Sequence, residues 1–127
     1  MTNLLYHYRV WIERIIDGDT VQCTIDQGLR IYRDERLRLL GVDTPELRAS
    51  DPAVRLKATA ARDYTAAWVL EHAAHASEET GTTVTKWPFI ARTVKADSFG
   101  RWLADVSCGA GHNLSADLLS SGNAAPY

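Results

Sequence analysis

The 127-residue sequence lacks several features that would each indicate a particular class of protein. Its two cysteines, Cys23 and Cys108, stand at no metal-ligand spacing, so we expect both to be reduced strand residues, buried or half-buried. No apolar run is long enough to span a membrane, which predicts that the membrane is not a partner. Residues 1–14 do not show the basic-then-apolar pattern of a signal peptide, so we expect a cytoplasmic protein.

An excess of basic charge is also missing, because 14 Lys and Arg residues face 16 Asp and Glu residues for a net charge of -2. A protein bound to nucleic acid mainly through its phosphates is more comfortably basic, so the total charge weighs mildly against such a partner. The distribution of charge weighs in favour of one. Basic residues crowd residues 30–38 and 92–101, and a local positive cleft on an acidic protein can still attract an anion.

The composition is otherwise that of a globular protein, with 46% hydrophobic and 24% charged residues. This balance argues against disorder, and the length allows a real core. The sequence shows no internal repeat, low-complexity tract or linker. We therefore expect one domain over residues 1–127, and a monomer.

Alternation of apolar and polar residues predicts strands in the first third of the chain. The expected strands cover residues 6–16, 21–26 and 29–42, the third of them long and bent, and form an antiparallel meander. Asp17-Gly18 between the first two is a hairpin signal, where glycine is expected to supply a positive φ.

Helical signals begin at Asp51-Pro52, where an aspartate cap precedes a proline at the first helical position. The helix is expected over residues 52–75, with one packed stripe formed by Ala58, Ala61, Thr65, Trp68 and Val69. Strand-like residues follow at 82–86, 89–94 and 102–108, and a short helix capped by Asn113 at 114–121. This order predicts an α+β fold: a five-stranded OB-type β-barrel with a long helix between strands three and four and a short C-terminal helix.

The most informative stretch is residues 36–46, with the sequence RLRLLGVDTPE. It begins as a strand and stops at Thr44-Pro45, because proline cannot donate to a sheet. Asp43 and Glu46 stand at this stop with Arg38 upstream, a grouping that packing explains poorly. Two further segments place an acid or an arginine at the mouth of a strand, namely Asp17-Gly18-Asp19-Thr20 and Gly100-Arg101.

These pieces, in this order, resemble the staphylococcal nuclease (thermonuclease) family over roughly residues 8–125. The resemblance implies a calcium-dependent phosphodiesterase, an endonuclease that hydrolyses DNA, with RNA a second candidate substrate, to 3′-phosphate and 5′-hydroxyl products. It also implies roles for individual residues: Ca²⁺ ligation by the Asp19 and Asp43 carboxylates and the Thr44 main-chain carbonyl, a further acid near the metal at Asp17, a general base at Glu46, and phosphate-binding arginines at Arg38 and Arg101.

Elementary chemistry is consistent with these roles. Hydrolysis of a phosphodiester requires donors that neutralise the phosphate as its charge grows, and guanidinium groups match phosphate oxygens in a planar fork. A carboxylate can act as base on water, and an all-oxygen shell suits a hard ion such as Ca²⁺. Each of these residues alone is more often a turn residue or a solvated charge. Their arrival together in family order reverses that balance.

A second hypothesis belongs to another class: a non-catalytic nucleic-acid-binding or protein-interaction module on the same barrel. Family relatives used in that way lack the acids and arginines, which are present here. Two departures remain. Ser98-Phe99 replaces a Lys-Tyr pair of the family's best-known member and bears on substrate affinity, and the long C-terminal helix of that member has no counterpart, so Tyr127 is given no stacking role.

The histidines suggest a competing metal site. His72 and His75 are one helical turn apart, as ligand pairs can be. No cysteine or third histidine is spaced to join them, so a solvated helix end is the favoured interpretation, and His7 and His112 stand alone in the sequence.

Overall fold

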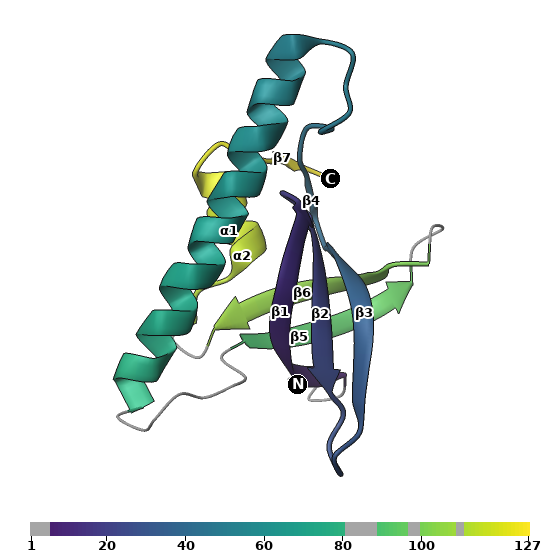
Figure 1. The fold of residues 1–127 in the computed structure, drawn as a ribbon, viewed down its shortest axis with the longest axis vertical. Coiled ribbons are helices and arrows are strands. Elements are labelled where there is room, and N and C mark those ends of the chain that lie inside the picture. The colour runs from purple at the N-terminus through teal and green to yellow at the C-terminus, as the bar shows by residue number, and fades with distance from the viewer. Residues whose placement is uncertain (1–5, 81–88, 97–99, 109–110) are drawn as a thin grey trace.

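The computed structural model describes residues 6–80, 89–96, 100–108 and 111–127, and in these ranges all side chains except those of 74–80. In chain order the elements are β1 (His7–Asp17), β2 (Thr20–Asp26), β3 (Tyr32–Leu39), β4 (Val42–Asp43), α1 (Pro52–Thr80), β5 (Phe89–Ala96), β6 (Trp102–Cys108), α2 (Leu114–Ser120) and β7 (Ala125–Pro126) (Figure 1). The long helix stands between the third and fourth barrel strands, so the predicted α+β class is confirmed.

Five strands close into a barrel in the order β1-β2-β3-β6-β5. Neighbours are antiparallel except β3 and β6, which run parallel with Leu37 opposite Trp102 and Leu39 opposite Ala104. This arrangement confirms the predicted OB-type barrel. The short strands β4 and β7 pair with each other in a separate two-stranded sheet, which joins the C-terminal residues to the segment that follows β3.

The core fills the barrel from alternate strand positions and continues under the helices. Val10, Val21, Leu37 and Val106 are fully buried inside it. α1 lies alongside β1, and α2 lies between α1 and β6 (Figure 1). The predicted α1 stripe is confirmed by the side chains that face the barrel, namely the buried Ala58, Ala61, Thr65 and Trp68 and the half-buried Val69. Both cysteines are free and buried, as expected.

The chain departs from the expected strands in two places. The expected third strand, residues 29–42, is interrupted at both ends. Leu29 and Arg30 have positive φ values of 56° and 63°, and Gly41, at φ 79°, separates β3 from β4. The strand expected at residues 82–86 lies outside the described residues. α1 extends five residues beyond the expected end, to Thr80. None of the described helices is long and apolar enough to cross a membrane.

The conformation of Gly18 differs from the one predicted from the sequence. It does not have the positive φ that we expected of the Asp17-Gly18 turn. Its role is spatial, because a Cβ atom there would lie 2.8 Å from the Cβ of Ala61 and 2.9 Å from the Cγ2 of Thr44. The Gly18 carbonyl also accepts a 2.7 Å hydrogen bond from Thr65 Oγ1. The missing side chain therefore lets α1 pack directly on the turn that carries Asp19.

Candidate active site

Six of the seven predicted site residues line one open groove of about 570 Å³ on the barrel, and they come from distant parts of the chain. These six are Asp17, Asp19, Arg38, Asp43, Glu46 and Arg101. The seventh, Thr44, is buried beside the groove, where its backbone N–H donates to Asp19. The fold thus brings together residues that the sequence distributes over three segments.

Asp19 and Arg38 form the centre of the groove. Arg38 Nη2 lies 3.2 Å from Asp19 Oδ2 and 3.2 Å from Asp43 Oδ1, so the guanidinium bridges the two acids. Asp19 is only 6% exposed, and its second oxygen accepts from Thr20 Oγ1 at 3.1 Å. Thr44 N donates to Oδ2 at 3.0 Å. Every oxygen of the buried Asp19 carboxylate therefore has a partner.

The second terminal nitrogen of Arg38 holds the break between β3 and β4. Arg38 Nη1 donates to the carbonyl of Leu39 at 3.0 Å and to that of Val42 at 2.7 Å. The chain therefore bends around the guanidinium, which is fixed from both sides. A side chain that packing and hydrogen bonds hold in one place is suited to bind charge without rearrangement.

Tyr127 is a residue of this groove to which the sequence pattern assigned no role. The Arg38 guanidinium carbon lies 5.6 Å from the centre of the Tyr127 ring, within the range of a cation–π contact. Tyr127 N donates to the carbonyl of Gly41 at 3.1 Å. The pairing of β7 with β4 brings it there, and no motif or spacing in the sequence signals that pairing.

The acids of the DGDT turn influence each other. Asp17 accepts a 3.3 Å hydrogen bond from Asp19 N, and its burial, followed by the hydrogen bond and charge of Asp19, raises the pKa of Asp17 to about 6. Burial also acts to raise the pKa of Asp19. It is outweighed by the hydrogen bonds with Asp17 and Thr44 N and by the charge of Arg38, which hold the pKa of Asp19 below its usual value. Asp19 is thus the carboxylate that the surroundings keep charged.

The chemistry of the groove fits a hard divalent cation. Four carboxylates face three basic side chains, those of Arg38, Lys95 and Arg101, and a phosphodiester would add further negative charge. Carboxylate and main-chain carbonyl oxygens are ligands that Ca²⁺ prefers. The acids do not form a closed cage, because the one trio of histidine, cysteine or acidic ligand atoms within 4.8 Å among the described side chains lies elsewhere. A cation here would therefore share its shell with water.

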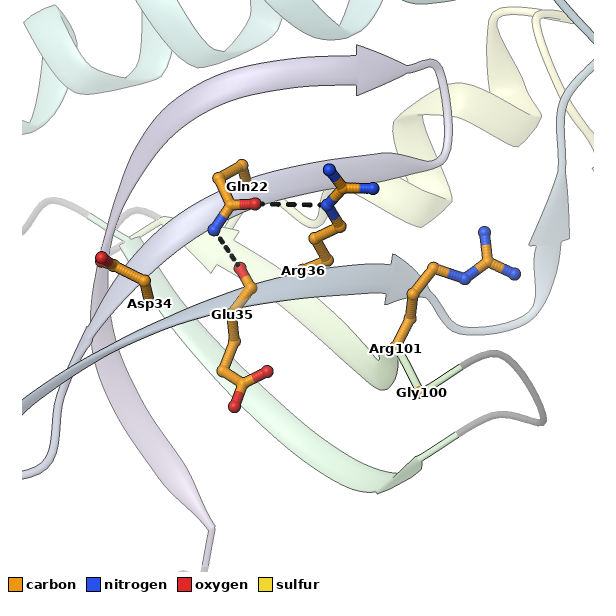
Figure 2. Close-up of a pocket in the computed structure, with 6 residues that line it drawn as sticks. All are labelled: Gln22, Asp34, Glu35, Arg36, Gly100 and Arg101. Atoms are coloured by element: carbon orange, nitrogen blue, oxygen red, sulfur yellow. Dashed lines mark hydrogen bonds between the residues drawn. The ribbon is translucent and has the colours of Figure 1, made fainter.

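Arg101 connects the groove to a neighbouring hollow. It precedes β6, and the parallel pairing of Arg38 with Leu103 brings it beside β3. Figure 2 shows that the side chains of Arg36 and Arg101 extend in the same direction from these two segments, while Arg36 Nε donates to Gln22 Oε1 at 3.4 Å. The hollow therefore contains two arginines, Arg36 and Arg101, together with two acids, Asp34 and Glu35. Residues 98 and 99, where the chain departs from the family pattern, lie outside the described residues.

A closed five-stranded barrel with acids and arginines gathered in one groove defines a class of OB-type protein suited to phosphate and cation ligands. The sequence model of the family described as Staphylococcal nuclease homologue matches residues 36–127, well over half of the chain. The chain belongs to this family, and the predicted resemblance is confirmed. Because the match begins at Arg36, the places of Asp17 and Asp19 in the groove are an observation independent of it.

The chain is also similar to an uncharacterized protein of Methanocaldococcus jannaschii, with 30% identity over 129 residues. The similarity covers 95% of this chain and 60% of that protein. The chain thus spans somewhat more than half of the length of this relative.

The expectation for the histidines is wrong in two respects. His72 is buried instead of solvated, and His112 lies against it, with ring centres 4.8 Å apart. Asp117 completes the trio of ligand atoms within 4.8 Å of one another. No sequence rule could indicate this group, because His72 is 40 residues from His112 and 45 from Asp117, and only the packing of α2 on α1 brings them together.

Proposed function

We propose that the chain is a Ca²⁺-dependent phosphodiesterase that cleaves DNA internally, with RNA as a second substrate, and leaves a 3′-phosphate and a 5′-hydroxyl. The observation that carries this proposal is the linked Asp19–Arg38–Asp43 cluster in a groove that Glu46 and Arg101 also line. Membership of the staphylococcal nuclease family supports it.

In this proposal Arg38 and Arg101 bind the non-bridging oxygens of the phosphate. Arg38 exchanges its exposed partner Asp43 for the phosphate and keeps its hydrogen bonds to the Leu39 and Val42 carbonyls, which hold the guanidinium in position. Because these donors are fixed before the substrate arrives, they stabilise the charge that develops on the phosphoryl oxygens as the phosphorus becomes five-coordinate.

The cation would be held by the carboxylates of Asp19 and Asp43 and by the main-chain carbonyl of Thr44, with Asp17 as a further acid beside Asp19. When bound, Ca²⁺ supplies Lewis acidity and neutralises part of the phosphate charge. Asp19 is prepared for this role, since its pKa lies below the usual value. Asp43 is exposed and can turn away from Arg38 at small cost, because exposed ion pairs contribute little.

Glu46 is the proposed general base. It is exposed on the wall of the groove, in the turn that follows β4, where Ala49 N donates to its carbonyl at 3.2 Å. It takes a proton from a water molecule whose oxygen bonds to phosphorus in line with the 5′ oxygen. The bond between phosphorus and the 5′ oxygen then breaks, and that oxygen leaves as a hydroxyl after taking up a proton from solvent water.

The test is hydrolysis of single-stranded DNA by the purified chain, with Ca²⁺ and with chelator. We expect fragments only with Ca²⁺. Glu46→Gln and Arg101→Lys should each lower kcat/KM by about 100-fold or more, the usual cost of losing a preorganised catalytic group. Asp19→Ala should weaken Ca²⁺ binding in a calorimetric titration. Arg30→Lys, an exposed arginine in the turn between β2 and β3, is the matched control and should act like the parent.

Salt separates catalysis from electrostatic steering. If Arg101 only attracts DNA, the lysine variant should be nearly as active as the parent at low salt, because steering depends on charge and not on the shape of the donor. That result would remove Arg101 from the chemistry. DNA binding of equal strength with Ca²⁺ and with chelator, without fragments, would favour the non-catalytic binding module instead.

A further inference from the structure

Three side chains from separate segments meet on the side of the molecule where α2 packs against α1. His72 comes from α1, His112 from the residues before α2, and Asp117 from α2. One ligand atom of each lies within 4.8 Å of the others. The groove described above contains none of them. We propose that they form a second metal site, which binds a divalent transition-metal ion, best Zn²⁺, and fastens α2 to α1.

The surroundings of His72 fix its ring and its tautomer. Nδ1 lies 2.8 Å from the carbonyl oxygen of Trp68. A carbonyl only accepts, so Nδ1 carries the hydrogen, and Nε2 of the neutral ring keeps a lone pair for a metal. Metal-binding histidines usually donate their other N–H in this way. The indole of Trp68 also stacks on the imidazole, with ring centres 4.2 Å apart, which limits its rotation.

Trp68 orients the carboxylate of the site as well. Its indole Nε1 donates to Asp117 Oδ2 at 2.8 Å, which leaves Oδ1 to bind an ion. The backbone of Asp117 is also held, since Tyr64 Oη donates to its carbonyl at 3.3 Å. One tryptophan therefore positions two of the three ligands, as outer groups do around metal ions.

The backbone around His112 is also fixed. Cys108 N donates to the His112 carbonyl at 3.0 Å. Asn113 caps α2, with its side-chain oxygen accepting from Ala116 N at 3.0 Å. The His112 side chain itself is exposed, so an ion can enter from solvent at this ligand, which is also the one with the most freedom to move.

The distances allow closure around a small ion. Bonds of about 2.0–2.1 Å in a tetrahedral site place ligand atoms about 3.3 Å apart. The observed limit of 4.8 Å therefore requires a contraction of at most about 1.5 Å, to which a rotation of His112 contributes for the two pairs that include it. Two imidazoles and one carboxylate suit Zn²⁺, with water in the fourth position. Ca²⁺ and Mg²⁺ prefer shells made only of oxygen, so the two proposed sites select different ions.

The test is a titration of the untagged full chain with Zn²⁺ by calorimetry, in saturating Ca²⁺ so that oxygen sites are occupied. We expect one Zn²⁺ per chain, a visible spectrum of tetrahedral Co²⁺ on substitution, and a higher Tm with Zn²⁺. His112→Ala should weaken Zn²⁺ binding by about 100-fold or more, beyond the 10–100-fold cost of losing an outer group. Asp117→Asn should also weaken Zn²⁺ binding. His7→Ala, an exposed histidine on β1, is the matched control and should bind like the parent.

Two outcomes would overturn the assignment. In the first, the parent binds Zn²⁺ no more tightly than His112→Ala does, or Ca²⁺ at a comparable concentration displaces the bound Zn²⁺. The other is a loss of binding in His75→Ala together with none in Asp117→Asn, which would place the ion on the helical pair His72 and His75. Because His112 does not line the groove, Ca²⁺-dependent hydrolysis by His112→Ala without Zn²⁺ should equal that of the parent. Failure of this site and failure of the proposed nuclease are therefore separate results.

Discussion

Replacing Arg38 by lysine removes a planar group from the centre of the groove while keeping its charge. Besides its cation–π contact with Tyr127, the guanidinium makes four polar contacts, two with the carbonyls of Leu39 and Val42 and two with the carboxylates of Asp19 and Asp43. An ammonium group is a single point that cannot reach both faces of the bend between β3 and β4. We therefore expect Arg38→Lys to destabilise the fold even in the absence of substrate.

The expected loss in the free energy of unfolding depends on which of these contacts are buried. The contact with Asp43 contributes little, because that carboxylate is 53% exposed. Three contacts remain, to two carbonyls and to the buried Asp19. Lysine can keep one of them, and each hydrogen bond to a charged group contributes about 1.5–3 kcal/mol, so the loss of two costs about 3 kcal/mol or more. With an m value of about 2 kcal/mol per M, the urea midpoint should fall by about 1.5 M.

The assay is urea unfolding in chelator, followed by the fluorescence of tryptophan, to which the buried Trp68 contributes. Arg36→Lys is the matched control, because Arg36 is an exposed arginine on the same strand, and it should change the free energy of unfolding by no more than about 0.5 kcal/mol. If Arg38→Lys falls within the same range, the contacts of Arg38 do not hold the bend. In that case Arg38 would serve the ligand alone.

Three further predictions concern other parts of the molecule. In chelator, Asp17→Asn should stabilise the protein above pH 6 and not below pH 4, because the pKa of Asp17 is raised to about 6 in the folded protein and its ionisation between pH 4 and pH 6 costs stability. Urea unfolding of both proteins across pH 4–8 checks the sign, and a gain confined to low pH would contradict it. Gly18→Ala should cost about 1–3 kcal/mol in unfolding experiments, because the new Cβ meets Ala61, and an unchanged stability would mean that α1 can shift freely. Cys23 should resist iodoacetamide in the folded protein, because burial, and to a smaller extent the charge of nearby acids, raises the pKa of its thiol to about 12. Rapid labelling of Cys23 in the native chain, detected by mass spectrometry, would refute this.

The parts of the fold that were predictable depend on local periodicity. Alternation marked β1 and β2, and helical spacing marked the stripe of α1 from Ala58 to Trp68. The groove could be anticipated residue by residue because motifs of the family stand at strand ends. Whether those residues act as the resemblance implies stays a prediction.

The parts that were not predictable depend on contacts that neither periodicity nor turn rules indicate; those of Gly18 and Tyr127 join distant segments, and those of Arg38 join residues near one another in the sequence. The need for glycine at position 18 arises from the approach of Ala61, which no turn rule contains. The interruption of β3 at Leu40-Gly41 depends on Arg38, whose guanidinium binds carbonyls on both sides of the bend. Tyr127 reaches the groove only because β7 pairs with β4. Each of these contacts joins segments or atoms that no local pattern relates.

The parallel pairing of β3 with β6 has a consequence for how the groove is assembled during folding. It joins Leu37 to Trp102 across about 65 residues, so it is among the slowest contacts to form, because long loops must close before it is made. Until β3 and β6 pair, Arg101 does not lie beside the acids near β2 and β4. During refolding, the return of the proposed hydrolysis should therefore lag behind the helical signal of α1, and the delay would measure the time the barrel takes to close.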